Sequence, residues 1–273
     1  MAADERNMPF IKHLASSDRK IRTSALGTLR TFLTAPTTAR KLTELDYLKL
    51  WKGLFYSVWM CDRPIPQQNL CAELADLLSV LPAPNDDECA VVIPFLRAFW
   101  ATLSREWTAI DVLRMEKYLL LVRRVFGASI SWARDGRKGK KAQKRPGARA
   151  DGILRLLEEW PLEKTGNLAK VPVGLRLHVL DIWVDEVEKL ELLAEDGDES
   201  SADPSNFLAR LRRIVEVQSK STCRPVQVRA NDSLADERLP WNKAGSSDEE
   251  MVENGDNGDN NDNGQDGWGG FDD

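Results

Sequence analysis

The chain has 273 residues, of which 42% are hydrophobic and 30% are charged, a composition typical of a globular protein that buries its own core. No run approaches the ~20 apolar residues that a membrane span needs, and no basic-then-apolar secretory signal opens the chain, so we expect no membrane partner. The net charge of −5 is uneven: residues 241–273 hold ten acidic residues against Lys243, which leaves residues 1–240 at +4, and such asymmetry favours nucleic-acid association or an interaction tail.

The first predicted helix of appreciable length lies in "SSDRKIRTSALGTLRTFL". Ser17 is the predicted N-cap, with Asp18 in the first turn. Apolar residues then recur at spacings of three and four.

Further helices are predicted along most of the chain, over residues 43–61, 66–81, 86–107, 108–136, 151–160, 173–194 and 205–218. Pro94 is expected either to kink its helix or to mark the true start. The stretch "CRPVQVRA" is predicted to be extended. The segment "YLLLV" is apolar on all sides, which indicates cover from more than one neighbour.

Hairpin signals are nearly absent, and proline-punctuated helices favour antiparallel pairs stacked in a row. The predicted fold is therefore all-α, an irregular α-solenoid or HEAT-like helical array without a clean period of about 40 residues. We divide it into residues 1–134 (the N-terminal array), 135–149 (a basic loop), 150–240 (helices of the same array) and 241–273 (a disordered acidic tail).

An aromatic stretch, "LWKGLFYSVWMCDRPIPQQ", raises the question of a ligand site. On a helix, Trp51, Phe55, Val58 and Trp59 share one face. A base-stacking platform would need exposed rings interleaved with basic residues. We predict instead that the face packs against neighbouring helices as structural core.

The same stretch carries a resemblance to a known family. "LWKGLFYSVWMCDRPIPQQNLCAELADLL" resembles the ribosomal-RNA-processing protein 1 family, together with "FIKHLASSDRKIRTSALGTLRTFL" and "FLRAFWATLSREWTAIDVLRMEKYLLLVRRVF". The resemblance covers Pro9 to Phe126 strongly and extends more weakly to about Val217. It implies a helical, non-enzymatic factor of the nucleus and nucleolus that matures the large ribosomal subunit. The partners that it implies are pre-ribosomal RNA and assembly factors, among them a Brix-domain protein and a WD-repeat protein.

Catalysis has little support in the sequence. The only histidines are His13 and His178, and "GRKGKKAQK" lacks the P-loop pattern and a preceding strand. No nucleophile, base and orienting group can be brought together, so we expect neither an enzyme nor a small-molecule substrate. A nuclease would need convergent carboxylates that hold metal ions, and no such set is evident.

The cysteines indicate no metal or cofactor either. They lie far apart without CxxC spacing, at Cys61, Cys71, Cys89 and Cys223. Zinc needs clustered ligands, so we predict free, buried thiols.

The basic loop is the strongest functional signal. The segment from Arg134 to Arg149 contains eight basic residues and one acidic residue, which gives it a net charge of +7. The basic residues are Arg134, Arg137, Lys138, Lys140, Lys141, Lys144, Arg145 and Arg149. The loop could track a phosphate backbone, serve as an import signal, or remain a solvated loop without contacts.

Two helix faces offer further phosphate contacts. Arg114, Lys117 and Arg124 fall within about one quadrant of their helix, and Arg212 and Arg213 lie opposite an apolar face. Such contacts would position RNA without reading its sequence. Ordinary charged helix faces remain the simpler interpretation of each cluster.

The tail carries two short motifs. Ser246 and Ser247 precede a pair of glutamates by three residues, which makes them candidate phosphorylation sites. Trp268 and Phe271 stand in a polar segment as a candidate anchor for a partner.

Two functions fit this sequence. The favoured one is a helical scaffold that joins pre-ribosomal RNA and assembly factors in the large-subunit precursor. The alternative is a general protein-interaction solenoid, an adaptor whose basic loop is only a nuclear localisation signal.

Overall fold

The computed structural model describes residues 8–35, 41–82, 87, 89–135, 147–193 and 204–243, and these residues are helical without a strand. The all-α prediction is therefore confirmed. The helices, in chain order, are α1 (Phe10–Leu14), α2 (Arg19–Thr34), α4 (Glu44–Trp59), α5 (Pro64–Val80), α6 (Cys89–Glu106), η3 (Trp107–Ala109), α7 (Val112–Asp135), α8 (Ala148–Glu159), α9 (Val173–Lys189), α10 (Pro204–Gln218), α11 (Arg224–Leu234) and α12 (Pro240–Lys243).

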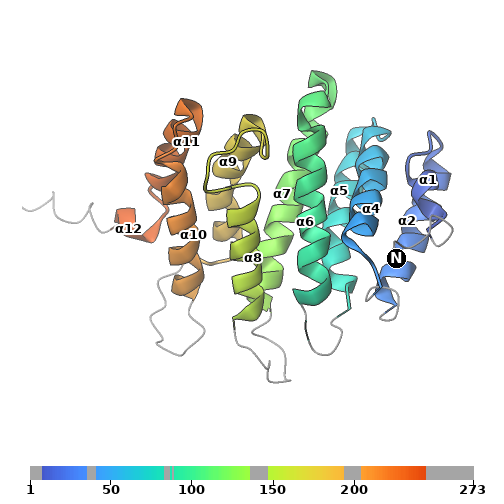
Figure 1. The fold of residues 1–273 in the computed structure, drawn as a ribbon, viewed down its shortest axis with the longest axis horizontal. Coiled ribbons are helices and arrows are strands. Elements are labelled where there is room, and N and C mark those ends of the chain that lie inside the picture. The colour runs from blue at the N-terminus through green and yellow to red at the C-terminus, as the bar shows by residue number, and fades with distance from the viewer. Residues whose placement is uncertain are drawn as a thin grey trace, which may run out of the picture.

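The helices form an array of pairs in two layers (Figure 1). In one layer α1, α4, α6, α8 and α10 follow one another, and each packs against the next. In the other, α2, α5, α7, α9 and α11 do the same. One continuous hydrophobic core lies between the layers and links all of the pairs. The HEAT-like label and the proposed domain boundaries stay predictions.

Local sequence signals explain where the helices begin. Thr43 and Asp46 form a capping box at the start of α4, since each side chain accepts a hydrogen bond from the other residue's backbone. Pro64 opens α5, where its missing N–H costs nothing. The predicted cap of α2 was wrong by one position: Asp18, not Ser17, accepts the hydrogen bond from the Lys20 amide.

Pro94 neither starts α6 nor stops it. The helix begins at Cys89 and continues through the proline to Glu106. Tertiary packing supplies the compensation, because Val91, Val92 and Phe95 around the proline are all buried in the core.

The aromatic stretch is largely interior, as predicted. Trp51, Phe55 and Val58 are buried, and Trp51 contacts the rings of both Phe95 and Phe99 at centroid distances of 4.9 and 4.8 Å. Phe55 stacks on Tyr118 of α7 at 4.5 Å, and the Tyr118 hydroxyl donates to the Phe55 carbonyl at 2.9 Å. Trp59 differs, because it is half-buried at the end of α4 and only borders the core.

A buried arginine fixes the connection between α8 and α9. The guanidinium of Arg176 donates to the Glu163 carbonyl at 2.6 Å and to the Gln218 side chain of α10 at 2.7 Å. The Glu163 carboxylate accepts hydrogen bonds from the amides of Thr165 and Asn167. Burial raises the pKa of Glu163, but these amides and Arg176 outweigh it, so the pKa lies below its ordinary value. This cluster orders the connection without any regular secondary structure.

The segment predicted to be extended is helical. Residues 224–234 form α11, with Pro225 in its first turn and Val226 and Ala230 buried one turn apart. The prediction is wrong because packing against α9 and α10 favours the helix here.

The four cysteines are free, as predicted, although only Cys61 and Cys71 are fully buried while Cys89 and Cys223 are half-buried. Burial raises the pKa of the Cys71 thiol to about 12, which makes it a packing residue rather than a nucleophile. Within the described residues, no helix combines the length and the apolar character that crossing a bilayer requires.

Candidate nucleic-acid interface

The basic loop leaves the array at the edge where α7 ends and α8 begins. α7 extends to Asp135, and α8 starts after Gly147, whose φ of 82° is a conformation that glycine adopts without strain. Six of the eight predicted basic residues lie outside the described residues: Arg137, Lys138, Lys140, Lys141, Lys144 and Arg145. The structure therefore describes the two ends of the loop, Arg134 and Arg149.

Arg149 joins the two ends of the loop. Its guanidinium lies over the ring of Trp132, 4.8 Å from the centroid, and donates to the Trp132 carbonyl at 3.1 Å. A cation over an indole contributes about 0.5–1 kcal/mol at a partly exposed site. The contact holds the start of α8 against the last turns of α7, so the loop is closed at its base.

Arg134, at the other end of the loop, contacts the end of α9. It donates to the carbonyl of Leu190, the C-cap residue of α9, at 2.9 Å. A cation at a helix C-terminus is favourable because the last carbonyls are unpaired. Arg134 and Arg149 are thus committed to structural contacts. The six residues between them remain the predicted phosphate-binding set.

The face predicted on α7 does not form a single cluster. Lys117 is buried, and its ammonium donates to the carbonyls of Trp59 and Cys61 at 2.8 and 3.0 Å and to Asp62 at 3.3 Å. The prediction of Lys117 as a phosphate contact is therefore wrong, because it satisfies the C-terminal end of α4 and no phosphate can reach it. Arg124, two turns along α7, is exposed and remains a candidate.

Arg114 is partly engaged by its neighbours. Its guanidinium lies 4.7 Å from the Trp59 ring centroid and pairs with Asp111. This contact also explains why Trp59 borders the core instead of filling it. One face of the Trp59 ring serves as a platform for a cation.

The two arginines predicted as phosphate contacts on α10 also differ in their surroundings. Arg212 pairs with Glu216 at 2.7 Å and lies over the ring of Trp241, 4.4 Å from its centroid. Trp241, which the sequence assigned to the acidic tail, is in α12. Arg213 is exposed and makes no ion pair or hydrogen bond with the described residues. Ser246, Ser247, Trp268 and Phe271 lie outside the described residues.

Acidic residues of α9 neutralise several other arginines. Asp185 accepts from Arg123 of α7 at 2.7 Å and from Arg238 at 3.1 Å, and Glu186 accepts from Arg123 at 2.7 Å. Burial raises the pKa of Asp185, but the two arginines more than offset it, so the pKa is lowered. These arginines link α9 to its neighbours and are not free for phosphate.

Sequence reasoning missed the repeated stacking of cations on half-buried tryptophans. The four pairs are Arg114 on Trp59, Arg149 on Trp132, Lys170 on Trp160 and Arg212 on Trp241. Only Trp132 and Trp160 are close in sequence to their cations, and no local spacing identifies the others. Sequence reasoning also missed Arg19 and Arg22 of α2, which line a groove.

The described residues contain no group of three metal-ligating side chains. His178 is half-buried, and its Nε2 lies 2.9 Å from the Leu119 carbonyl, which makes it a packing residue of the α7–α9 contact. Burial lowers the pKa of His178, against weaker opposing effects of Leu119 and Asp181.

Comparison with known proteins identifies the family. The profile described as "Nucleolar protein, Nop52" matches residues 5–267. Human ribosomal RNA processing protein 1 homolog B is 32% identical to this chain over 201 residues, which cover 72% of this chain and 24% of the relative. Human ribosomal RNA processing protein 1 homolog A is also 32% identical, over 71% of this chain and 40% of its own length. The Dictyostelium discoideum homolog is 25% identical over 87% of this chain and 47% of its own length.

The chain thus spans about a quarter to a half of the length of these curated relatives. The similarity extends over both layers of the helical array and includes the aromatic stretch on which the predicted resemblance rested. The chain belongs to the ribosomal RNA processing protein 1 family, which the profile describes as the nucleolar protein Nop52 family.

Proposed function

We propose that the chain acts in ribosome biogenesis as a non-enzymatic assembly factor of the large ribosomal subunit, located in the nucleolus. In this role the array is a scaffold that binds pre-ribosomal RNA through its basic loop. Other faces of the array bind assembly factors, with a Brix-domain protein and a WD-repeat protein as the expected partners. The names of the relatives support the processing of ribosomal RNA as the setting.

The observation that carries the proposal is the closed base of the basic loop. The contact between Arg149 and Trp132 brings the chain on both sides of the loop together at one edge of the array. Six basic residues lie within the intervening segment, residues 136–146, and no acidic residue does. Such a segment releases counterions when it binds a phosphate backbone.

Exposed apolar residues support the protein-binding part of the proposal. Val112 and Leu113, at the start of α7, have 87% and 92% of their surface exposed. Met60 and Ile65, at the turn between α4 and α5 that Lys117 contacts, are exposed as well. Exposed apolar groups at one edge of a soluble array mark surfaces that proteins bind.

The test replaces the six central basic residues of the loop by Ser and attaches an independent import signal. Arg134 and Arg149 stay unchanged, because their loss would disturb the array. The matched control replaces four exposed lysines and two exposed arginines elsewhere, namely Lys20, Lys41, Lys164, Lys220, Arg63 and Arg155. Native complexes are then purified, and the precursor RNA in them is quantified at several salt concentrations.

RNA contact predicts that the loop variant loses precursor association and shows a shallower salt dependence, whereas the control variant loses much less. Equal association of the two variants would assign the loop to import alone and favour the adaptor. Purified chain that cuts precursor RNA, with the activity abolished by one Asp or Glu substitution, would contradict the non-enzymatic role.

A further inference from the structure

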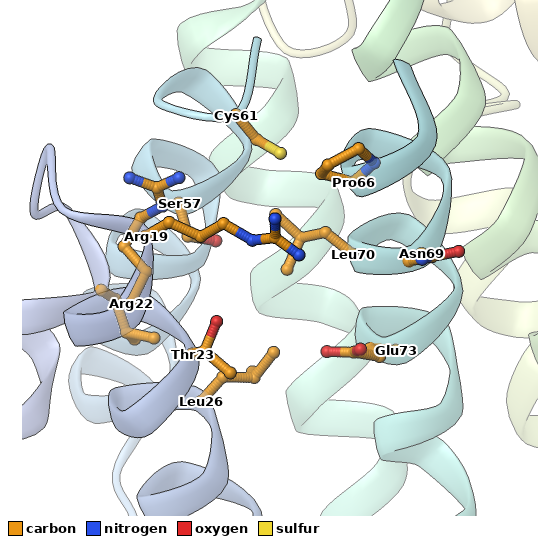
Figure 2. A pocket seen from close by; sticks show the side chains of 11 residues that line it. Arg19, Arg22, Thr23, Leu26, Ser57, Cys61, Pro66, Asn69, Leu70 and Glu73 are labelled. Atoms are coloured by element: carbon orange, nitrogen blue, oxygen red, sulfur yellow. The ribbon is translucent and has the colours of Figure 1, made fainter. Parts of the chain in front are cut away.

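A groove lies between α2 and α5, near the end of the array that begins with α1 (Figure 2). Its volume is about 140 Å³. Leu26 of α2 forms one side, Pro66 and Leu70 of α5 form the other, and Cys61 after α4 lies at the top of the view in Figure 2. An apolar cavity of about 150 Å³ is large enough to bind benzene, so the groove can accept one aromatic ring.

One part of the groove is positively charged. Arg19 is exposed, and its guanidinium extends between the two helices towards α5 (Figure 2). Arg22 donates to the carbonyls of Ser16 and Ser17 at 2.8 and 2.9 Å, which fixes its position. Neither arginine pairs with a carboxylate among the described residues. The cations are therefore available to an anionic ligand.

The remaining polar groups of the groove restrict the ligand further. Thr23 and Asn69 also line the groove, and the Thr23 hydroxyl can hydrogen-bond to a peptide backbone. Glu73 lines the part near Leu26, away from Cys61, and disfavours a second carboxylate there. The matching ligand is an extended peptide with one aromatic ring and with its carboxylates on the side of Arg19.

We propose that this groove binds residues 266–273 of the chain itself, "DGWGGFDD", with the ring of Trp268 between Leu26 and Leu70. The carboxylates that flank the ring then face Arg19 and Arg22. The glycines on both sides of the tryptophan let the peptide backbone approach the helices closely. The acidic charge, the ring of Trp268 and the glycines beside it all match the groove.

The segment is long enough to reach the groove. α12 ends at Lys243, at the opposite end of the array from α2 (Figure 1). Neighbouring helices in a layer are about 8–10 Å apart, so five pairs span roughly 40 Å between the first and last axes. The 25 residues from Lys243 to Trp268 reach about 80 Å when extended. Residues 244–273 contain ten acidic residues and no basic residue, so their charge is opposite to that of Arg19 and Arg22.

The first test uses the full chain with the photo-crosslinking residue p-benzoylphenylalanine in place of Trp268. After irradiation, the crosslinked peptides are mapped by mass spectrometry. We expect crosslinks within one chain, to α2 and α5 at the groove. Crosslinks to the basic loop, scattered crosslinks, or crosslinks that join two chains would each overturn the intramolecular contact.

Two charge reversals on α2, Arg19→Glu in the groove and Lys20→Glu beside it, test whether the contact is specific. Arg19→Glu should lower the crosslinking yield at least fivefold, while Lys20→Glu, at an adjacent exposed residue that does not line the groove, should change the yield less than twofold. Both positions are exposed on the first turn of α2, so folding is preserved. Equal effects of the two substitutions would mean that only general electrostatic attraction draws the acidic segment to α2. That result would contradict a specific site.

The second test adds a fluorescent peptide of residues 262–273 to the full chain and measures its anisotropy. The full chain with Trp268→Ala and Phe271→Ala should bind the peptide at least fivefold more tightly than the unchanged chain, whose own segment competes. Equal affinity would overturn the proposal. Displacement of the peptide by an equal concentration of a short RNA would overturn it too, and would assign the groove to RNA phosphates.

Discussion

The indole Nε1 of Trp51 in α4 donates a hydrogen bond to the carbonyl oxygen of Phe95 in α6, at 2.8 Å. The bond crosses between neighbouring helix pairs and lies among packed aromatic rings. Trp51 therefore contributes both apolar packing and a buried hydrogen bond that joins α4 to α6.

Trp51→Phe should lower the free energy of unfolding by about 1–3 kcal/mol, because a buried hydrogen bond is lost and its acceptor stays buried. Trp51→Ala should cost about 3–5 kcal/mol, since it also leaves a cavity. Chemical denaturation measures both changes. Trp59→Phe is the control and should cost less, because Trp59 is half-buried. Equal losses at the two positions would contradict the assignment of Trp51 to the centre of the core.

Lys117→Met should lower the free energy of unfolding by about 1–3 kcal/mol, because the carbonyls of Trp59 and Cys61 lose their donor. Arg124→Met lies on the same helix but is exposed, so it should change stability by less than about 0.5 kcal/mol. In binding assays with precursor RNA the order should reverse, with Arg124→Met as the weaker binder. An Arg124 variant that binds RNA normally would remove this residue from the interface.

His178 should make the chain less stable as the pH falls from about 7 to 5. Its folded-state pKa is lowered by burial, so the unfolded chain takes up a proton first, and stability is lost below the unfolded pKa of about 6.5. Asp181 and Arg123 are the charged groups that act on it, and they oppose each other. His178→Gln should flatten the stability profile in this window, which denaturation at a series of pH values measures.

Arg149→Ala should cost about 0.5–2 kcal/mol, because it removes both the stacking on Trp132 and the hydrogen bond to the Trp132 carbonyl. Arg155→Ala, at an exposed position two turns along α8, should have little effect. Hydrogen exchange should show faster opening of the last turn of α7 and the first turn of α8 in the Arg149 variant alone. Unchanged exchange there would mean that the base of the loop is held by other contacts.

Much of this fold follows from local sequence patterns. The periodic apolar residues, the capping residues and the prolines predict most helices and their approximate ends, because these signals act within one or two turns. The helical face that Trp51, Phe55 and Val58 share is enough to predict that they lie in the core. The prediction of an extended segment is wrong at α11, where contact with α9 and α10 favours a helix.

The candidate interface was less predictable, since charge alone does not reveal exposure. A helical wheel places Lys117 and Arg124 on one face of α7, yet one is buried and the other is exposed. The difference arises where the turn between α4 and α5 meets α7 and covers Lys117. In the same way, Arg176 is fully buried because Glu163 and Gln218 arrive from other segments.

Residue types and their spacing within a few turns are enough to predict the helical class, the interior aromatic face and the basic segment between α7 and α8. They do not predict which cations end a helix, stack on a tryptophan or line a groove. Those outcomes depend on acceptors and rings that lie far away in the chain, and the packing of the two layers brings them within reach.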